Sequence, residues 1–333
     1  MTKFLWIIVV VFLVSCQNDR LNVDVSAISV DLKLKRYDQL FFASNPSNLA
    51  PALQNAYSTD SSFIDLYTAD IIRIGLFKNE DFYHYLDLFR HDTVIAQVAD
   101  TVLKTFYDFQ YYSTQLEKGF QHLKYYFPEA KIPTIYTYVS GFNQSLVVSN
   151  DGIGIGLDKY LGSDCIFYKY LGIPQYKIKN MYPDKLVPDV FYAWALTEYP
   201  KTEESNNLLS EMIHEGKLLY FTEAMCPDLP DSVIIGYSAA QLSWCRKNEA
   251  QMWSYWAEHR LLYSVERLDL QKYVGDAPFT NTFSNESPGR TGVWTGWQIV
   301  RSYMNQHPEL SLEMLMTQGN AQELLAQSRY FPE

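Results

Sequence analysis

The spacing of apolar and polar residues divides the chain into three stretches of different character. Residues 63–127 carry apolar and aromatic residues at helical spacing with little glycine, which predicts several helices. Residues 132–148 are rich in β-branched and aromatic residues, which is typical of strands. From Pro188 onward the helical spacing returns. The pattern predicts an α+β fold that is mostly helical, with a small sheet near the middle of the chain.

Two further segments define the expected sheet. Residues 28–34 alternate strictly between apolar and polar, which predicts a half-buried strand. Asn150-Asp151-Gly152 is a turn signal, so residues 153–157 should return as a strand, whose glycines would let a ligand or another backbone approach closely. We therefore expect a small antiparallel sheet. The helices expected after it cover residues 188–199, 205–225, 239–263, 298–305 and 311–327.

The first residues have the pattern of an export signal. Lys3 precedes an apolar run, Phe4 to Val14, of about 11 residues, which is too short to span a bilayer core of roughly 30 Å. The run ends in Leu13-Val14-Ser15-Cys16, which resembles the lipobox of bacterial lipoproteins. We expect residues 1–15 to be a cleaved signal peptide and Cys16 to carry acyl chains such as palmitate. Residues 16–26 are polar enough to serve as the lipidated N-terminus and a short tether.

Composition favours a folded body on that tether. The chain is 47% hydrophobic and 16% aromatic, so we expect residues 27–333 to form a single globular domain, helical to about residue 130, with the sheet and further helices in residues 131–333. The formal net charge of −11 argues against nucleic acid as a partner, because nucleic acids attract basic surfaces. The membrane is expected to be reached through the lipid.

The helix expected over residues 205–225 carries the candidate chemistry. It is apolar on nearly every side and should be buried, yet it contains His214, Glu215 and Lys217, which need partners inside the fold. His214-Glu215 matches the start of the zincin motif H-E-x-x-H, but Leu218 replaces the second histidine. We therefore expect a zincin-like core with a degenerate metal motif.

Glu249 is the candidate for a third zincin ligand, but one histidine and one glutamate leave the site short of a ligand. We expect no metal, no cofactor and no catalytic residue. His214, Glu215, Lys217 and Glu249 are instead expected to form a vestigial site or a structural ion network. Whether the protein is an enzyme stays open, and the missing second histidine of the motif argues against it.

Two smaller features leave alternatives open. Gly289, Arg290 and Gly292 lie in a loop before a helix and could hold an anion, or the loop could be a tight turn with Arg290 paired to an acid. Cys226 and Cys245 could form a disulfide in an oxidising compartment, or remain buried thiols.

These segments together resemble the gliding-motility lipoprotein GldB family. The resemblance is carried by His214-Glu-Gly-Lys-Leu-Leu-Tyr220, Gly236-Tyr237, Trp244-Cys-Arg-Lys-Asn-Glu249, Ser287-Pro-Gly-Arg-Thr-Gly292 and Gly296-Trp-Gln-Ile-Val-Arg-Ser-Tyr303. It implies a cell-envelope lipoprotein required for gliding, with protein partners in the gliding and type IX secretion machinery. It implies no catalytic activity for particular residues.

Two functions follow as hypotheses. The first is a non-enzymatic component or stabiliser of the gliding machinery, anchored by lipid in the outer membrane and facing the periplasm. The only acid directly after Cys16 is Asp19, which gives no strong signal for export to the cell surface. The second is a zincin-derived hydrolase, or a peptide- or glycan-binding lipoprotein of the envelope. The hydrolase requires His214, Glu215 and Glu249 to converge in an open cleft.

Overall fold

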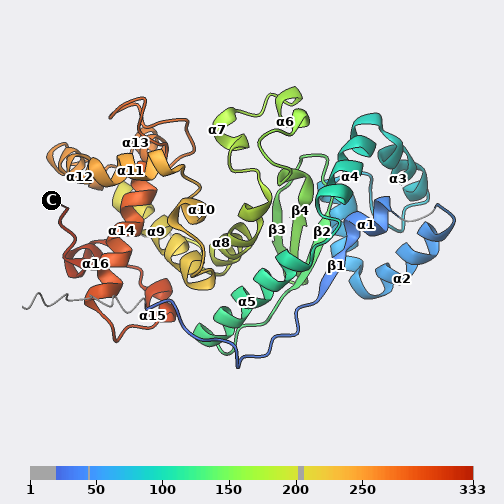
Figure 1. Ribbon diagram of the computed structural model, residues 1–333, viewed down its shortest axis with the longest axis horizontal. Coiled ribbons are helices and arrows are strands. Elements are labelled where there is room, and N and C mark those ends of the chain that lie inside the picture. The colour runs from blue at the N-terminus through green and yellow to red at the C-terminus, as the bar shows by residue number, and fades with distance from the viewer. Residues whose placement is uncertain (1–19, 44–45, 202–205, 333) are drawn as a thin grey trace, which may run out of the picture.

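A four-stranded sheet stands in the middle of the structure, with helices on both of its faces (Figure 1). The computed structural model describes residues 20–43, 46–201 and 206–332 of the chain. The strands, in the order β1-β2-β4-β3, are β1 (Leu34–Arg36), β2 (Thr134–Tyr138), β4 (Gly152–Gly156) and β3 (Leu146–Ser149).

The sheet is mixed, so the prediction of an antiparallel sheet was wrong. β1 pairs with β2, and β2 with β4, in parallel, and only β3 and β4 form the predicted hairpin. A tight turn such as the one at Asn150–Asp151 forces an antiparallel pair, whereas a long connection lets the chain return in parallel. Residues 37–133 connect β1 to β2, and local periodicity carries no information about the direction in which such distant strands pair.

Alternate residues of β2 enter two separate hydrophobic cores. Ile135 packs in the larger core, and Tyr136 and Tyr138 pack in the smaller one. Glycines in β4 make room for the rings of the smaller core, because a Cβ on Gly154 would lie 2.7 Å from Tyr138 and 2.9 Å from Phe63. At Gly152 and Gly156 the nearest neighbour is the backbone of Thr134 and of Gln144, so the predicted close approach of another backbone is confirmed at these two positions.

The N-terminal part of the chain is helical, as predicted. Figure 1 shows α1 to α4 gathered at one end of the molecule, with α5 running below the sheet. These elements are α1 (Tyr37–Phe42), α2 (Pro46–Asp65), the π-helix η1 (Leu66–Ile71), α3 (Phe82–His91), α4 (Thr93–Thr105) and α5 (Gln110–Tyr126).

Residues 20–33 form an extended segment that we call the N-terminal strap. It runs below the sheet from the C-terminal helices to β1 (Figure 1). The predicted strand over residues 28–34 was wrong, since only Leu34 belongs to β1. The alternation reflects burial without strand pairing: Val30 is buried in the larger core, and Ile28 offers its carbonyl to the side chain of Gln121.

The C-terminal part contains most of the helices. Two predicted helices are each divided: residues 239–263 break at Asn248 and residues 311–327 break at residues 318–320. The elements are the 3-10 helices η2 (Leu157–Lys159), η3 (Pro183–Lys185) and η4 (Leu261–Tyr263), and the helices α6 (Ile166–Tyr170), α7 (Gln175–Ile178), α8 (Leu186–Glu198), α9 (Leu208–Met225), α10 (Asp231–Ile235), α11 (Ala239–Lys247), α12 (Glu249–Glu258), α13 (Arg267–Tyr273), α14 (Thr291–Gln306), α15 (Leu312–Thr317) and α16 (Ala321–Ser328).

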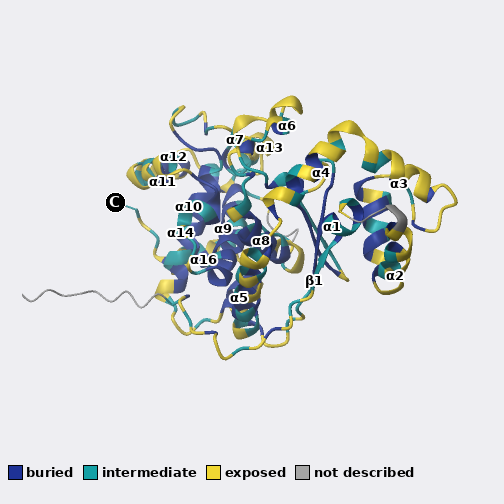
Figure 2. Ribbon diagram, turned by 45° about the vertical axis from the view of Figure 1, so that its right-hand side comes forward, coloured by how far each residue is buried: buried dark blue, intermediate teal, exposed yellow. Residues whose placement is uncertain are grey.

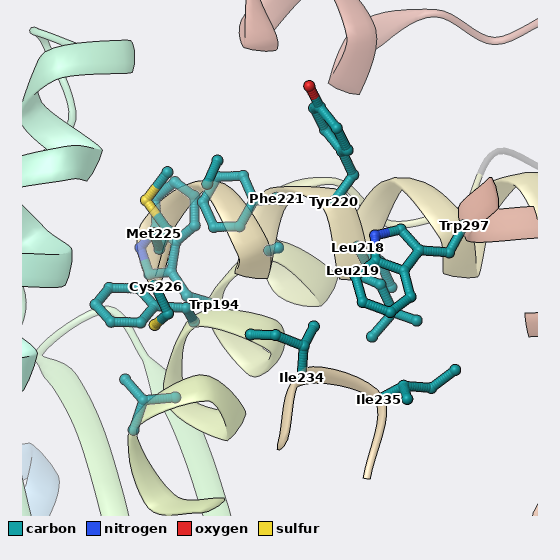
Figure 3. Close-up of a cluster of buried hydrophobic side chains, with 14 of the residues drawn as sticks. Trp194, Leu218, Leu219, Tyr220, Phe221, Met225, Cys226, Ile234, Ile235 and Trp297 are labelled. Atoms are coloured by element: carbon teal, nitrogen blue, oxygen red, sulfur yellow. The ribbon is translucent and has the colours of Figure 1, made fainter. Parts of the chain in front are cut away.

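Helix α9 forms the centre of the larger core, as its all-round apolar pattern predicted. Buried side chains surround it, among them Leu218, Phe221 and Trp194 (Figure 3). In Figure 2 the ribbon of α9 and its neighbour α14 is mostly coloured as buried.

The zincin-like core is not supported. A zincin places its histidine-bearing helix beneath the edge strand of a sheet, whereas here α8 lies between the sheet and α9 (Figure 1). His214 is therefore separated from the sheet by a layer of helix.

The predicted signal peptide, residues 1–15, and Cys16 lie outside the described residues. Of the predicted tether, residues 20–26 belong to the N-terminal strap, and Leu21 and Val25 are buried. No helix in the described ranges is long and apolar enough to cross a membrane.

Candidate functional site

The His214-Glu215-Gly216-Lys217 segment lies where α9 crosses α14. Gly216 faces Gly296 of α14, and a Cβ on Gly216 would collide with the backbone of Gly296 and lie 2.7 Å from the amide nitrogen of Trp297. The absence of a side chain at both positions therefore sets how closely the two helices pack. Because α9 has apolar neighbours on nearly every side, its polar residues depend on partners from other elements.

Glu215 is held by an aromatic hydroxyl and a guanidinium. Tyr192 of α8 donates to Oε2 of Glu215 at 2.7 Å, and Nη2 of Arg290 donates to the same oxygen at 3.2 Å. Burial and the nearby carboxylate raise the pKa of Tyr192 above its usual range. Burial alone would lower the pKa of Arg290, but Tyr192 and Glu215 raise it overall. The charge of Glu215 is therefore matched by Arg290.

The predicted anion loop supplies that arginine. Arg290 adopts a left-handed conformation (φ +59°) directly before α14, and its Nε lies 3.9 Å from Oδ1 of Asp276. Tyr237 donates to the carbonyl of Gly289 at 2.5 Å. Gly292 is buried in the first turn of α14. The loop thus directs its one cation at the carboxylates of Glu215 and Asp276.

Lys217 points to the opposite side, and no acid among the described residues forms an ion pair with it. Its Nζ donates to the carbonyls of Met316 at 3.1 Å and Gln318 at 2.9 Å, at the C-terminal end of α15. Only 8% of the residue is exposed, and burial lowers the pKa of its ammonium to about 8. Lys217 thus satisfies carbonyls that the end of a helix leaves open.

His214 borders a small cavity of about 70 Å³ that Lys201 and Lys217 also line. The histidine is half-buried, and burial lowers the pKa of its imidazole, with Glu215 opposing this effect and Lys217 adding to it. Burial favours the neutral imidazole, two lysine side chains line the same cavity, and the nearby Glu211 is already paired with Lys201.

Glu249 lies in a different environment, at the start of α12. It accepts a hydrogen bond from the Tyr330 hydroxyl at 2.6 Å, and burial raises the pKa of its carboxyl despite that bond. The four predicted residues therefore belong to separate sets of partners: Glu215 with Tyr192 and Arg290, Lys217 with carbonyls of α15, Glu249 with Tyr330, and His214 at the cavity. Across residues 20–43, 46–201 and 206–332, no group of three or more His, Cys, Asp or Glu side chains is placed to hold a metal ion.

A second charged cluster joins α9, α10 and α14, and the sequence reasoning did not single it out. Nη2 of Arg301 lies 2.7 Å from both Oε1 of Glu223 and Oδ1 of Asp231, and its guanidinium stacks 3.8 Å above the ring of Trp297. Trp297 also donates to Glu223 at 2.9 Å. Burial raises the pKa of Glu223, whereas Arg301 outweighs burial at Asp231 and lowers the pKa of that carboxyl.

The signal for this cluster was present in the Gly296–Tyr303 segment, which contains both Trp297 and Arg301. The cluster fixes α10 to the crossing of α9 and α14. Arg246 also lies 3.3 Å from Asp231, so two arginines match two carboxylates, which is typical of a structural network.

The described cysteines are free thiols. Cys226 and Cys245 are buried and Cys165 is half-buried, so the structure contains the buried-thiol alternative and not the Cys226–Cys245 bridge. Burial raises the pKa of Cys226 and of Cys245, which disfavours the reactive thiolate.

Comparison with known proteins is consistent with this picture. A family model described as gliding motility protein GldB matches residues 18–332, nearly the whole chain. No curated protein and no solved structure matches the chain. The match spans the strap, the crossing of α9 and α14 and the Arg290 loop, and it confirms the resemblance found in the sequence. The chain belongs to the family of the gliding motility protein GldB.

Proposed function

We propose that this protein is a cell-envelope lipoprotein that supports gliding as a non-enzymatic component of the machinery, through contacts with other proteins. Membership of the gliding motility family supports the proposed role in gliding, and the lipobox at Cys16 supports the proposed lipid anchor. The proposed location is the periplasmic side of the outer membrane, and the proposed partners belong to the gliding and type IX secretion apparatus.

One observation carries the non-enzymatic part of the proposal. Each charged residue of the His214–Lys217 segment that could do chemistry already has a structural task. Glu215 would be the general base of a zincin, but its Oε2 accepts hydrogen bonds from both Arg290 and Tyr192, which hold the carboxylate within the fold. Lys217 donates to a carbonyl at the end of α15, and Gly216 allows the close contact between α9 and α14.

A glycan-binding platform receives no support from the tryptophans. Each tryptophan in the described ranges is buried or half-buried. The hydrolase alternative likewise lacks the convergence that it requires, because Glu249 is bonded to Tyr330 and not to the α9 residues.

The test is complementation of a strain that lacks the gene. A double variant, His214→Gln with Glu215→Gln, keeps an oxygen at position 215 that can accept from Tyr192 and Arg290, but it removes the base and the imidazole. We expect gliding on agar at close to the wild-type rate, with normal protein abundance. Loss of gliding at normal abundance and unchanged thermal unfolding would overturn the proposal and favour chemistry at these residues.

The matched control is Cys16→Ser, which removes the expected lipid attachment and leaves the body intact. We expect the variant to be absent from the membrane fraction and gliding to be lost. Normal gliding by an unlipidated protein would contradict the anchored form of the proposal.

A further inference from the structure

The N-terminal strap begins at a fixed point on the body. Nη1 of Arg20 donates to the carbonyls of Met304 at 2.6 Å and His307 at 3.0 Å, and Nη2 donates to the carbonyl of Leu310. These carbonyls lie at the C-terminal end of α14 and in the connection to α15. The negative end of a helix dipole adds to the attraction for a guanidinium. Leu21, the next residue, is buried.

This fixed point is very close in sequence to the expected lipid. Cys16 precedes Arg20 by four residues, and an extended chain covers at most about 3.6 Å per residue, so the two Cα atoms lie within roughly 14 Å of each other. A chain of this length folds into a body with a radius of gyration of about 20 Å. The tether is therefore shorter than the radius of the body that it holds, and the body cannot turn freely above the membrane.

The surface around Arg20 has side chains suited to a lipid headgroup layer. Arg20 lines a surface cavity of about 360 Å³ together with Tyr125, Tyr220 and Leu312. Tyr125, at the end of α5, is 48% exposed, and Met314, in α15, is 54% exposed. A tyrosine combines an apolar ring with a polar hydroxyl, which suits the interface between water and hydrocarbon.

Electrostatic attraction alone would not bind this surface to a membrane. Glu309, just before α15, and Glu313, in its first turn, are exposed, and the whole chain is acidic. Anionic lipids would repel such a surface, so it needs the covalent anchor to stay at the membrane. The occupant that the short tether brings to it is the bilayer in which its own lipid is embedded.

We propose that the body rests on the phospholipid surface through the face formed by Arg20, the end of α5 and α15, with Tyr125 and Met314 entering the headgroup layer. This inference rests on the proposed lipid anchor at Cys16. It directs α6, α7 and α13, which lie along the opposite edge of the molecule in Figure 1, away from the membrane. Those elements carry exposed apolar residues that remain accessible from the periplasm, among them Tyr170 and Leu268.

The experiment uses the full lipidated protein in vesicles of phosphatidylethanolamine and phosphatidylcholine. A photo-crosslinking amino acid replaces Tyr125 or Met314 in the test variants, and Tyr170 or Leu268 in the controls, which are at least as exposed. We expect lipid adducts, detected by mass, to be several times more abundant at positions 125 and 314 than at 170 and 268. Equal adducts at all four positions would overturn the proposed surface.

A second variant tests the cause of the orientation. A Gly-Ser insert of about 20 residues between Asp19 and Arg20 adds a flexible span of roughly 25 Å. We expect adducts at positions 125 and 314 to fall several-fold, while the lipid on Cys16 is unchanged. Adducts that stay as abundant as before would show that the short tether does not orient the body.

The remaining outcomes separate the two proposals. Crosslinks from positions 125 and 314 to another protein in whole cells, in place of lipid, would overturn the membrane surface but leave the anchor intact. A mature protein without lipid on Cys16 would overturn the anchor and this surface with it.

Discussion

At the scale of single residues, the half-buried Arg20 and the buried Lys217 bind the two ends of one short helix. Arg20 binds the carbonyl of Leu310 just before α15, and Lys217 binds the carbonyls of Met316 and Gln318 at its other end. A helix of six residues has no stability of its own, because nucleation is costly. The position of α15 therefore depends on groups supplied by the strap and by α9.

Lys217 makes stability depend on pH in a defined direction. Its pKa is about 8 in the fold and near 10.5 in the unfolded chain. Below pH 8 the ammonium is charged in both states, and the fold bears the full cost of burying it. Between pH 8 and 10.5 only the unfolded chain keeps the proton, so this cost disappears as pH rises; the change is about 3 kcal/mol.

The comparison that isolates this effect is urea unfolding of the wild type and Lys217→Met across that pH range. We expect the free energy of unfolding of the wild type to rise relative to the variant as pH increases from 8 to 10.5. Tyrosines and other groups titrate in both proteins and cancel in the difference. If the unfolding free energies of the two proteins changed in parallel with pH, the Lys217 amine would not be buried as described.

The sequence predicted that Glu215 and Lys217 need partners, but it could not identify them. Arg290 lies 75 residues after Glu215, and Met316 lies 99 residues after Lys217. A buried charge signals that a partner exists, whereas the partner's identity depends on how distant helices cross. The position of Glu249 could not be predicted for the same reason, because α12 places Glu249 against Tyr330.

At the scale of elements, the crossing of α9 and α14 organises the helical half. Both helices are mostly buried, and glycines at the contact let their backbones touch. Figure 3 shows buried side chains packed around α9, among them Trp297 of α14. In a helix interior, glycine is less favourable than alanine by about 1 kcal/mol, so the two glycines are retained at a cost in helix propensity.

Replacement of Gly216 by alanine tests this crossing. Helix propensity alone predicts a gain in stability. The new methyl group, however, collides with the backbone of Gly296, and overpacking of this kind costs about 1–3 kcal/mol. We expect a lower urea midpoint for Gly216→Ala. Gly319→Ala is the control, since a Cβ at Gly319 meets nothing within 4 Å. A midpoint for Gly216→Ala equal to or above that of the wild type would show that the two helices can move apart without loss of stability.

The elements themselves were predictable where the signal was local. The apolar pattern of α9, the turn before β4 and the helical stretch over residues 63–127 all appear in the structure. Helix breaks were missed, because Asn248 interrupts two helices that continue the same apolar pattern. Strand direction was missed because β1 and β2 lie far apart in sequence.

At the scale of the whole molecule, the N-terminal strap ties the two halves together. It begins on α14, passes α5 and continues into β1 at the edge of the sheet. Three of its side chains, those of Leu21, Val25 and Val30, are buried. Full burial of such a residue contributes about 1.5–3 kcal/mol, so the strap contributes a large part of a typical stability of about 5–15 kcal/mol.

Deletion of residues 17–33 should therefore destabilise the body far more than its length implies. We expect a large fall in the urea midpoint, or failure to fold, measured by circular dichroism. Deletion of residues 17–19 alone is the control and should leave the midpoint unchanged. A stable body after the longer deletion would contradict the role of the strap.

Arg20 also imposes an order of events on the making of the protein. Its partners Met304, His307 and Leu310 follow it by 284 to 290 residues, so they are synthesised and exported near the end of the chain. Until then Arg20 lacks these carbonyl partners, and the neighbouring Cys16 stays unhindered by the C-terminal helices. The enzymes that would process and acylate this cysteine therefore have the whole time of translocation in which to act. Docking of Arg20 comes last, once the C-terminal helices have been exported.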